Sequence, residues 1–206
     1  FTSGDMAKAE VEYLNVLKIE PNNGLAIGRL GLIYSEQGRV GRAVAYLMKG
    51  HELLPENLDL RIKLGQLYLA TGRTKEAVDE INYVLDRRPD DPEAPLMLAG
   101  TSTKPEESAA VRQRLQSLPA PANTGAPVLV ALATLDLAQQ RVNEAEAHLQ
   151  QALAADPKFA AAYTVMASVR MFRKDAAAAD QAYKRAAELS PVRSTRRPDS
   201  PGTGRP

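Results

Sequence analysis

The side chains that most often carry chemistry in proteins are few in this sequence and widely separated. The chain has no Cys, and its only two His residues are His51 and His148. Without Cys there is no thiol nucleophile, no disulfide and no thiolate ligand for zinc. Neither His has Asp, Glu or His at a spacing typical of metal ligands or of a catalytic pair. We therefore expect both to be surface residues, and we expect no catalytic, metal or cofactor site.

Charge and hydropathy exclude further classes of protein. Among 206 residues, 26 Lys and Arg balance 25 Asp and Glu, for a formal net charge of +1. This balance argues against a nucleic-acid partner, because the release of counterions requires a basic face. No run of eighteen apolar residues occurs, so no membrane span is predicted. Ala, Leu and the other strong helix formers are abundant, which predicts an all-α fold.

The two ends of the sequence differ from its middle. The chain begins at Phe1 without an initiator Met, so we interpret it as a fragment or a processed form of a longer protein. Residues 194–206 are dominated by Ser, Thr, Arg, Pro and Gly, which predicts a disordered basic tail. Arg193, Arg196 and Arg197 could contact anionic lipid or an acidic protein, but we favour a solubilising role.

A repeat of 34 residues determines the elements that position the remaining side chains. Within each repeat a small residue is followed four positions later by a large apolar one, which places both on one face of a helix. Each half of the repeat is therefore predicted to be an amphipathic helix. The residues that mark the period are Pro21, Pro55, Pro89, Pro157 and Pro191, with Asn123 in the one missing place.

The ends of the predicted helices carry turn and capping residues. Gly38 and Gly72 lie between the two halves, where a left-handed turn would end the first helix. Asp91 and Pro92 are predicted to open a first helix, with Asp as its cap and Pro as its first residue. The residues predicted to cap second helices are Asp5, Thr74, Asn143 and Asp175.

The order of residues within the repeat resembles that of the tetratricopeptide-repeat (TPR) family. Residues 24–57 carry Leu30-Gly31, Tyr34, Ala43, Leu47, Gly50 and Pro55, and residues 58–91 carry Leu64-Gly65, Tyr68, Ala77, Ile81, Val84 and Pro89. The resemblance covers about residues 4–193. It implies a right-handed α-solenoid of antiparallel helix pairs, the TPR superhelix, in which the first helices line a concave groove.

The phase of the repeat divides the chain and predicts eleven helices. The predicted units are 1–23, the second half of a truncated repeat, then full repeats at 24–57, 58–91, 92–125, 126–159 and 160–193, and the tail 194–206.

The repeat at 92–125 is degenerate. Ser102 replaces the Tyr, Pro105 is expected to end the first helix early, and Pro119 should shorten the second and open an extended Pro-rich loop over 119–125. We favour a decayed repeat that its neighbours hold in register. The alternative is a hinge, or a loop presented to a partner.

The resemblance also implies which residues face the groove. We expect a mildly basic end and an end that is apolar with hydroxyl groups, and we expect about half of these residues to pack between repeats. The predicted peptide-binding residues are Leu25, Arg29, Leu32, Ser35, Ile62, Lys63, Gln66, Leu69, Val130, Thr134, Leu137, Thr164, Ser168 and Met171.

Two functions follow from the resemblance. The first is a non-catalytic scaffold that holds a peptide or protein segment within a bacterial assembly, such as one for the envelope or for exopolysaccharide export. The second is the regulatory or substrate-docking region of a larger enzyme. The compartment stays unidentified, with a periplasmic or membrane-tethered location favoured over the cytoplasm. Uncapped terminal repeats leave self-association open as well.

Overall fold

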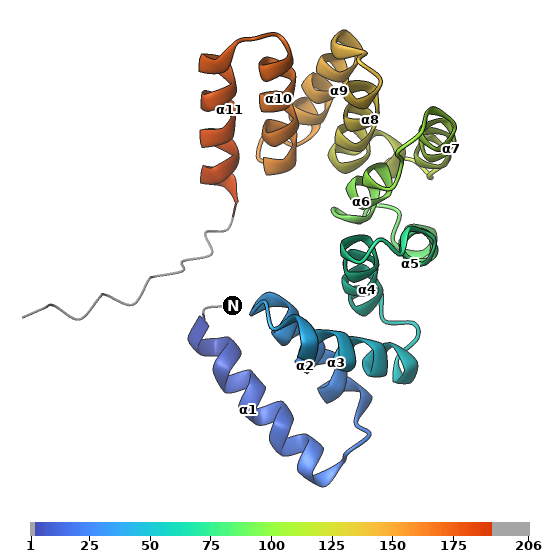
Figure 1. Cartoon of the computed structure of the whole chain (residues 1–206), viewed down its shortest axis with the longest axis vertical. Coiled ribbons are helices and arrows are strands. Elements are labelled where there is room, and N and C mark those ends of the chain that lie inside the picture. The colour runs from blue at the N-terminus through green and yellow to red at the C-terminus, as the bar shows by residue number, and fades with distance from the viewer. Residues whose placement is uncertain (1–2, 191–206) are drawn as a thin grey trace, which may run out of the picture.

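Paired helices form an arc in the computed structural model, which describes residues 3–190 (Figure 1). The predicted right-handed, all-α solenoid is confirmed, with eleven α-helices, one 3-10 turn and no strand among these residues. The predicted tail 194–206 lies outside them. The helices are α1 (Ser3–Ile19), α2 (Gly24–Glu36), α3 (Val40–Leu53), α4 (Leu58–Ala70), α5 (Thr74–Arg87), α6 (Ala94–Gly100), α7 (Pro105–Gln116), α8 (Ala126–Ala138), α9 (Val142–Ala155), α10 (Ala160–Phe172) and α11 (Ala176–Leu189), with η1 (Ala122–Thr124) before α8.

Left-handed residues end the first helices, as the sequence predicts. Gly38 and Gly72 have φ angles of +69° and +74°. Gln140 and Lys174 hold the equivalent places later in the chain, with φ angles of 60° and 62°. The left-handed turn is therefore kept even where a side chain makes it less favourable.

The predicted caps of the second helices are mostly wrong. Asp175 does cap α11, because its Oδ1 accepts a hydrogen bond from the amide of Ala178 at 3.0 Å. Thr74 and Asn143 instead lie inside the first turns of α5 and α9, and Asp5 lies inside α1. The turn is one residue shorter than expected before α5 and two residues shorter before α9, so an Arg that cannot accept a hydrogen bond precedes each of these helices.

The first helices have better caps. Asn23 and Asn57 accept hydrogen bonds from the first-turn amides of α2 and α4. The predicted cap Asp91 accepts from the amides of Glu93 and Ala94, at 2.9 and 2.7 Å. Pro92 precedes α6 and is not its first residue.

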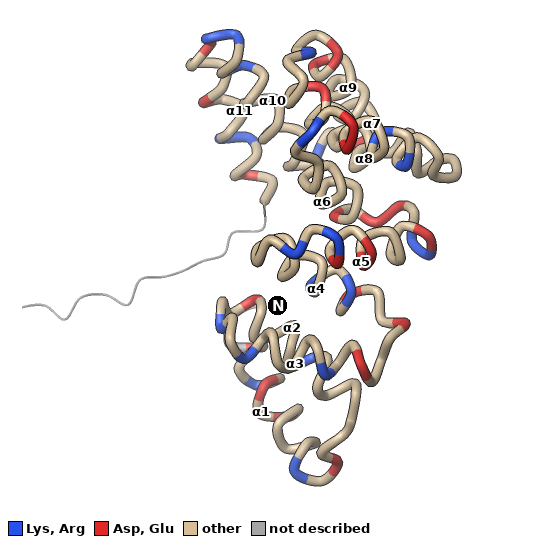
Figure 2. The backbone as a smooth tube through the Cα atoms, turned by 45° about the vertical axis from the view of Figure 1, so that its right-hand side comes forward, with Lys and Arg blue, Asp and Glu red and all other residues tan. Residues whose placement is uncertain are grey.

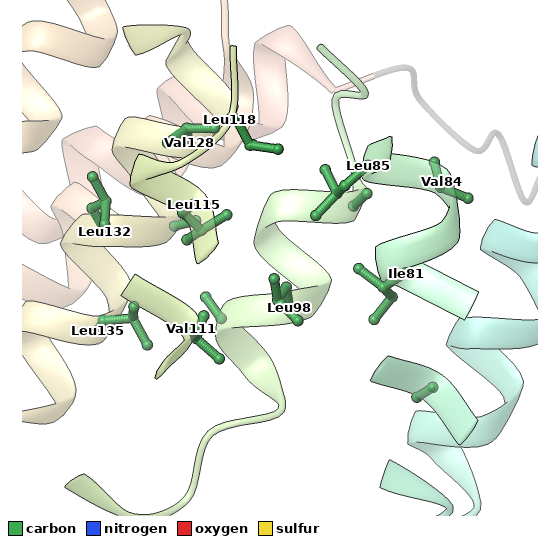
Figure 3. Packing of buried hydrophobic residues seen from close by; sticks show 14 of the residues in the cluster. Ile81, Val84, Leu85, Leu98, Val111, Leu115, Leu118, Val128, Leu132 and Leu135 are labelled. Atoms are coloured by element: carbon green, nitrogen blue, oxygen red, sulfur yellow. The ribbon is translucent and has the colours of Figure 1, made fainter. Parts of the chain in front are cut away.

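The core continues through the degenerate repeat. One cluster joins Ile81, Val84 and Leu85 of α5 to Leu98 of α6, and then to α7 and α8 (Figure 3). Separate clusters lie on either side, around α2–α4 and around α8–α10. The short helix α6 thus still contributes to a shared core.

Two expectations for the degenerate repeat require correction. Pro105 begins α7, whereas α6 already ends at Gly100. Residues 119–125 are not an extended loop throughout, because η1 forms within them and Ala122 is 8% exposed. Amides of the segment donate to the carbonyls of Pro119, Pro121 and Ala122, which gives it local hydrogen bonds.

Helix α7 should exchange its amide hydrogens faster than α5. The buried residues of α7 are Ser108, Val111 and Leu115, whereas α5 buries four apolar side chains. A helix that buries less apolar surface opens locally at a lower free energy. Hydrogen exchange followed by mass spectrometry measures this, and equal protection of the two helices would contradict the prediction.

Candidate functional site: a charged pocket between α2, α4 and α6

The first helices of successive pairs contact one another along the solenoid. Contacts join α2 to α4, α4 to α6, α6 to α8 and α8 to α10. Figure 1 shows α4 and α6 on the inner side of the arc, with α5 and α7 outside them. Residues on these first helices are therefore placed to line a concave surface.

A pocket of about 510 Å³ lies between α2, α4 and the start of α6. It contains three of the predicted groove residues. Leu32 and Lys63 are half-buried, and Ile62 is 5% exposed. The full lining is Leu32, Glu36, Asp59, Ile62, Lys63, Arg88, Asp90, Asp91, Pro92 and Glu93.

The charge of this pocket differs from the expected mildly basic end. Five carboxylates and two cations line it, so the pocket is acidic. Lys63 is the one predicted cation that lines the pocket. Its Nζ lies 3.2 Å from Glu36 Oε1, so the charge of Glu36 offsets that of Lys63. The other predicted cation, Arg29, is exposed on α2 but is not part of the lining.

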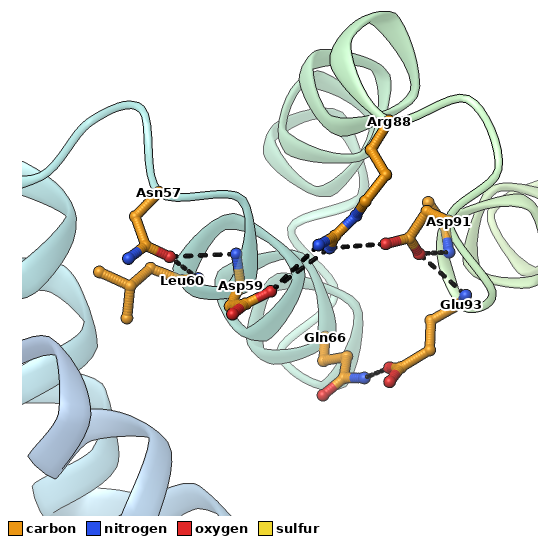
Figure 4. A network of polar contacts seen from close by, with 8 residues as sticks. Asn57, Asp59, Leu60, Gln66, Arg88, Asp91 and Glu93 are labelled. Atoms are coloured by element: carbon orange, nitrogen blue, oxygen red, sulfur yellow. Dashed lines mark hydrogen bonds and ion pairs between the residues drawn. The ribbon is translucent and has the colours of Figure 1, made fainter.

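A polar network fixes the edge of the pocket (Figure 4). Arg88 lies between Asp91 Oδ2 at 2.7 Å and Asp59 Oδ1 at 3.3 Å. Burial lowers the pKa of Arg88, but the charges and hydrogen bonds of Asp91 and Asp59 outweigh it and leave this pKa raised. Gln66 Nε2 donates to Glu93 Oε2 at 2.6 Å, which ties α4 to the residue before α6. These contacts hold the carboxylates in place before any ligand arrives.

The other predicted groove residues of α2 and α4 surround this pocket without lining it. Leu25 is 55% exposed, and Ser35, Gln66 and Leu69 are half-buried. Leu69 packs against the central core cluster, as expected for residues between repeats.

The predicted groove residues of α8 and α10 do not join the pocket. Val130 is completely buried, so it packs between helices and cannot contact a ligand. Thr134 Oγ1 donates to the carbonyl of Val130 at 2.9 Å. Thr164 and Ser168 donate to carbonyls of their own helix, at 3.4 and 3.5 Å. Leu137 is half-buried and Met171 is 53% exposed, so these two present the apolar surface of this half.

The two histidines are not simple surface residues, contrary to expectation. His148 Nδ1 lies 2.8 Å from Asp136 Oδ2, and Asp136 is 1% exposed. His51 Nε2 lies 3.7 Å from Glu80 Oε1. Each contact joins two helices, so spacing along the sequence could not reveal it. No group of three or more His, Cys, Asp or Glu residues suited to a metal ion occurs within residues 3–190.

Charges of both signs are distributed over the whole solenoid (Figure 2). This agrees with the balanced composition of the sequence. None of the helices in the described part of the chain is long and apolar enough to cross a membrane.

The sequence did contain one signal for the acidic pocket that the repeat pattern obscured. Asp90, Asp91 and Glu93 lie within four residues at a border between repeats, where the repeat pattern assigns a role only to Asp91, as a cap. Arg88 belongs to the same stretch of sequence, and only Asp59, from α4, joins them through folding.

Comparison with known proteins gives one family. Sequence models of the tetratricopeptide repeat match residues 35–100 and 130–194, together more than half of the chain. A search of curated proteins found no match.

Solved structures share the fold at low sequence identity. A chain of the APC/C hetero-tetramer Cut9–Hcn1 aligns with a TM-score of 0.67 and 18% identity, over 91% of this chain and 37% of that one. PilW, a type IV pilus biogenesis factor, aligns with a TM-score of 0.57 and 18% identity, over 81% and 77% of the two chains. YrrB, described as having an unusual peptide-binding site, aligns with a TM-score of 0.51 and 16% identity, over 88% and 93%.

Proposed function

The chain belongs to the tetratricopeptide-repeat family, and we propose that it is a non-catalytic scaffold that holds a peptide or protein segment against its concave surface. The pocket between α2, α4 and α6 carries this proposal, because apolar residues and fixed charges meet there. The neighbour YrrB is described as a TPR protein with an unusual peptide-binding site, and another neighbour is a chain of the Cut9–Hcn1 hetero-tetramer.

The charge of the pocket favours a basic segment. Five carboxylates surround an apolar surface made by Leu32, Ile62 and Pro92. Complementary charge accelerates association and disfavours acidic competitors, while apolar contacts prolong the bound state. A segment with aliphatic side chains flanked by Lys or Arg matches both features.

The finer proposal is a role in a bacterial envelope or exopolysaccharide-type assembly. It is supported by the fold neighbour PilW, which is described as a type IV pilus biogenesis factor. Fractionation of cells that express the tagged protein from its native locus tests this role. Recovery only in the soluble cytoplasmic fraction would argue against it.

Reversing the charge of the pocket should abolish the binding of basic peptides. We expect a peptide library selected on the wild-type chain to be enriched in Lys and Arg beside aliphatic residues. Glu36→Lys combined with Glu93→Lys should weaken the selected peptides at least about tenfold, since several fixed charges act together. Fluorescence anisotropy at two salt concentrations measures the affinity, and the wild-type affinity should fall as salt rises.

A matched control reverses the charge of two carboxylates that lie outside the pocket. Asp79 and Glu144 are exposed on α5 and α9, so Asp79→Lys combined with Glu144→Lys should leave the affinity unchanged. Circular dichroism should report the same helicity for all three proteins. If both double variants bind as the wild type does, the segment binds on another surface and the proposal is wrong.

A further inference from the structure

A second pocket of about 440 Å³ lies at the edge of the solenoid, between the α5–α6 and α7–α8 connections. The degenerate repeat forms one of its walls. Its lining is Pro89, Asp90, Asp91, Pro119, Ala120, Pro121, Ala122, Gly125, Pro127 and Val128. Its volume falls within the range of about 300–1,000 Å³ that is typical of ligand pockets.

The walls of this pocket are apolar and rigid. Apart from two Asp residues, the lining consists of Pro, Ala, Gly and Val. Pro, Ala and Gly lose no side-chain entropy when they are covered, so ordering these walls around a ligand costs little. The flat, apolar faces of Pro rings pack well against aromatic rings, the pairing on which Pro-rich recognition depends.

The two Asp residues have different roles. Asp91 is 2% exposed, and it already accepts hydrogen bonds from two amides and pairs with Arg88. Asp90 is exposed and makes no ion pair with any residue in the range 3–190. Asp90 is therefore the carboxylate that is available to a ligand cation.

The second pocket continues the first. Asp90 and Asp91 line both pockets, and Asp90 is exposed, so a segment in the acidic pocket can pass over Asp90 into the Pro-lined one. The other carboxylates of the acidic pocket also favour a cation near this junction.

We propose that the Pro-lined pocket receives one aromatic side chain of the bound segment, while Asp90 holds a Lys or Arg next to that ring. The proposal rests on the function proposed above, because ring and cation belong to the segment held in the groove. It adds a specific subsite, in which Pro119 and Pro121 of the degenerate repeat line one pocket together with Pro89 of the preceding repeat and Pro127 of the following one.

Short probes test this subsite without the rest of the segment. The probes are the N-acetyl dipeptide amides Phe-Arg, Phe-Glu and Ala-Arg, titrated while ¹H–¹⁵N spectra record the amides of Ala122, Gly125 and Val128. Phe-Arg should shift these amides in a saturable way, whereas the other two should not saturate over the same range. Asp90→Asn should weaken Phe-Arg about two- to fivefold, as expected for one exposed charge pair. The matched control Asp79→Asn should leave the titration unchanged.

The outcomes separate this proposal from the proposed function. If Phe-Glu or Ala-Arg titrates as Phe-Arg does, or if no probe shifts these amides, the subsite does not exist. An effect of Asp79→Asn equal to that of Asp90→Asn would also overturn it. The scaffold proposal is tested separately, because Glu36 and Glu93 line only the acidic pocket.

Discussion

Replacing Asp136 by Ala should lower the free energy of unfolding by about 3 kcal/mol, because it leaves two guanidinium groups facing a buried cavity. Asp136 is 1% exposed at the end of α8. Its Oδ1 lies 2.6 Å from Arg112 Nη2 and 2.8 Å from Arg141 Nη2, while its Oδ2 lies 2.8 Å from His148 Nδ1. One carboxylate thus connects α7, α8 and α9. Urea unfolding followed by circular dichroism measures the effect.

Two further variants show whether the charge network is the cause. Asp79 is exposed on α5, so Asp79→Ala should change stability by no more than about 0.5 kcal/mol. Arg112→Val combined with Asp136→Tyr introduces the residues that stand at these positions two repeats earlier, Val44 and Tyr68. There Arg73, the counterpart of Arg141, lies 4.4 Å from the centroid of the Tyr68 ring. This double variant should recover most of the lost stability. A single Asp136→Ala variant as stable as the wild type would show that the network contributes nothing.

The sequence pattern alone shows Asp136 and Arg170 only as departures from the repeated Tyr. The structure shows that their partners change with them. Arg170 pairs with Glu146 at 2.9 Å, just as Asp136 pairs with Arg112, and the partner lies 24 residues earlier in both cases. Each pair joins a second helix to the first helix of the next repeat. A change at one position is thus matched at the other, which a search for the repeated Tyr cannot detect.

Features that depend on local geometry were predictable. Gly38 and Gly72 adopt the left-handed turn because the chain must reverse within a few residues there. Asp91 accepts a hydrogen bond from the amide of Ala94, the first residue of α6, because a carboxylate shortly before a helix reaches its free amides, although Glu93 and not Asp91 directly precedes the helix. The period of the repeat likewise placed Leu30, Leu64 and other apolar residues in the core.

The candidate site was less predictable, because it depends on contacts between repeats. Lys63 was expected to make the groove basic, but Glu36 from the preceding pair lies 3.2 Å away. Val130 was expected in the groove, yet it is completely buried between helices. A helix of a solenoid has neighbours on several sides, so its phase alone does not decide which of its faces remains open.

Gly50→Ala should destabilise the protein by about 1–3 kcal/mol, although Ala is the better helix former. A Cβ atom at Gly50 in α3 would lie 2.9 Å from the Cα and 3.2 Å from the N of Gly28 in α2. Both contacts are with backbone, so no side chain can rotate away and the two helices must separate. Leu60 Cδ1 would also lie 3.3 Å away, which brings the next repeat into the same contact. Urea unfolding should show a lower midpoint, and hydrogen exchange should show faster opening of α2 and α3.

The same substitution earlier in α3 provides the control. A Cβ atom at Gly41 meets nothing within 4 Å, so Gly41→Ala gains helix propensity without a clash. It should stabilise the protein by about 0.5–1 kcal/mol. Both variants add one methyl group to a glycine of α3. If Gly50→Ala lowers the free energy of unfolding while Gly41→Ala raises it, the difference between them isolates the cost of separating α2 from α3. If Gly50→Ala stabilises the protein as Gly41→Ala does, the two helices can separate freely, and the close approach at Gly28 does not determine their packing.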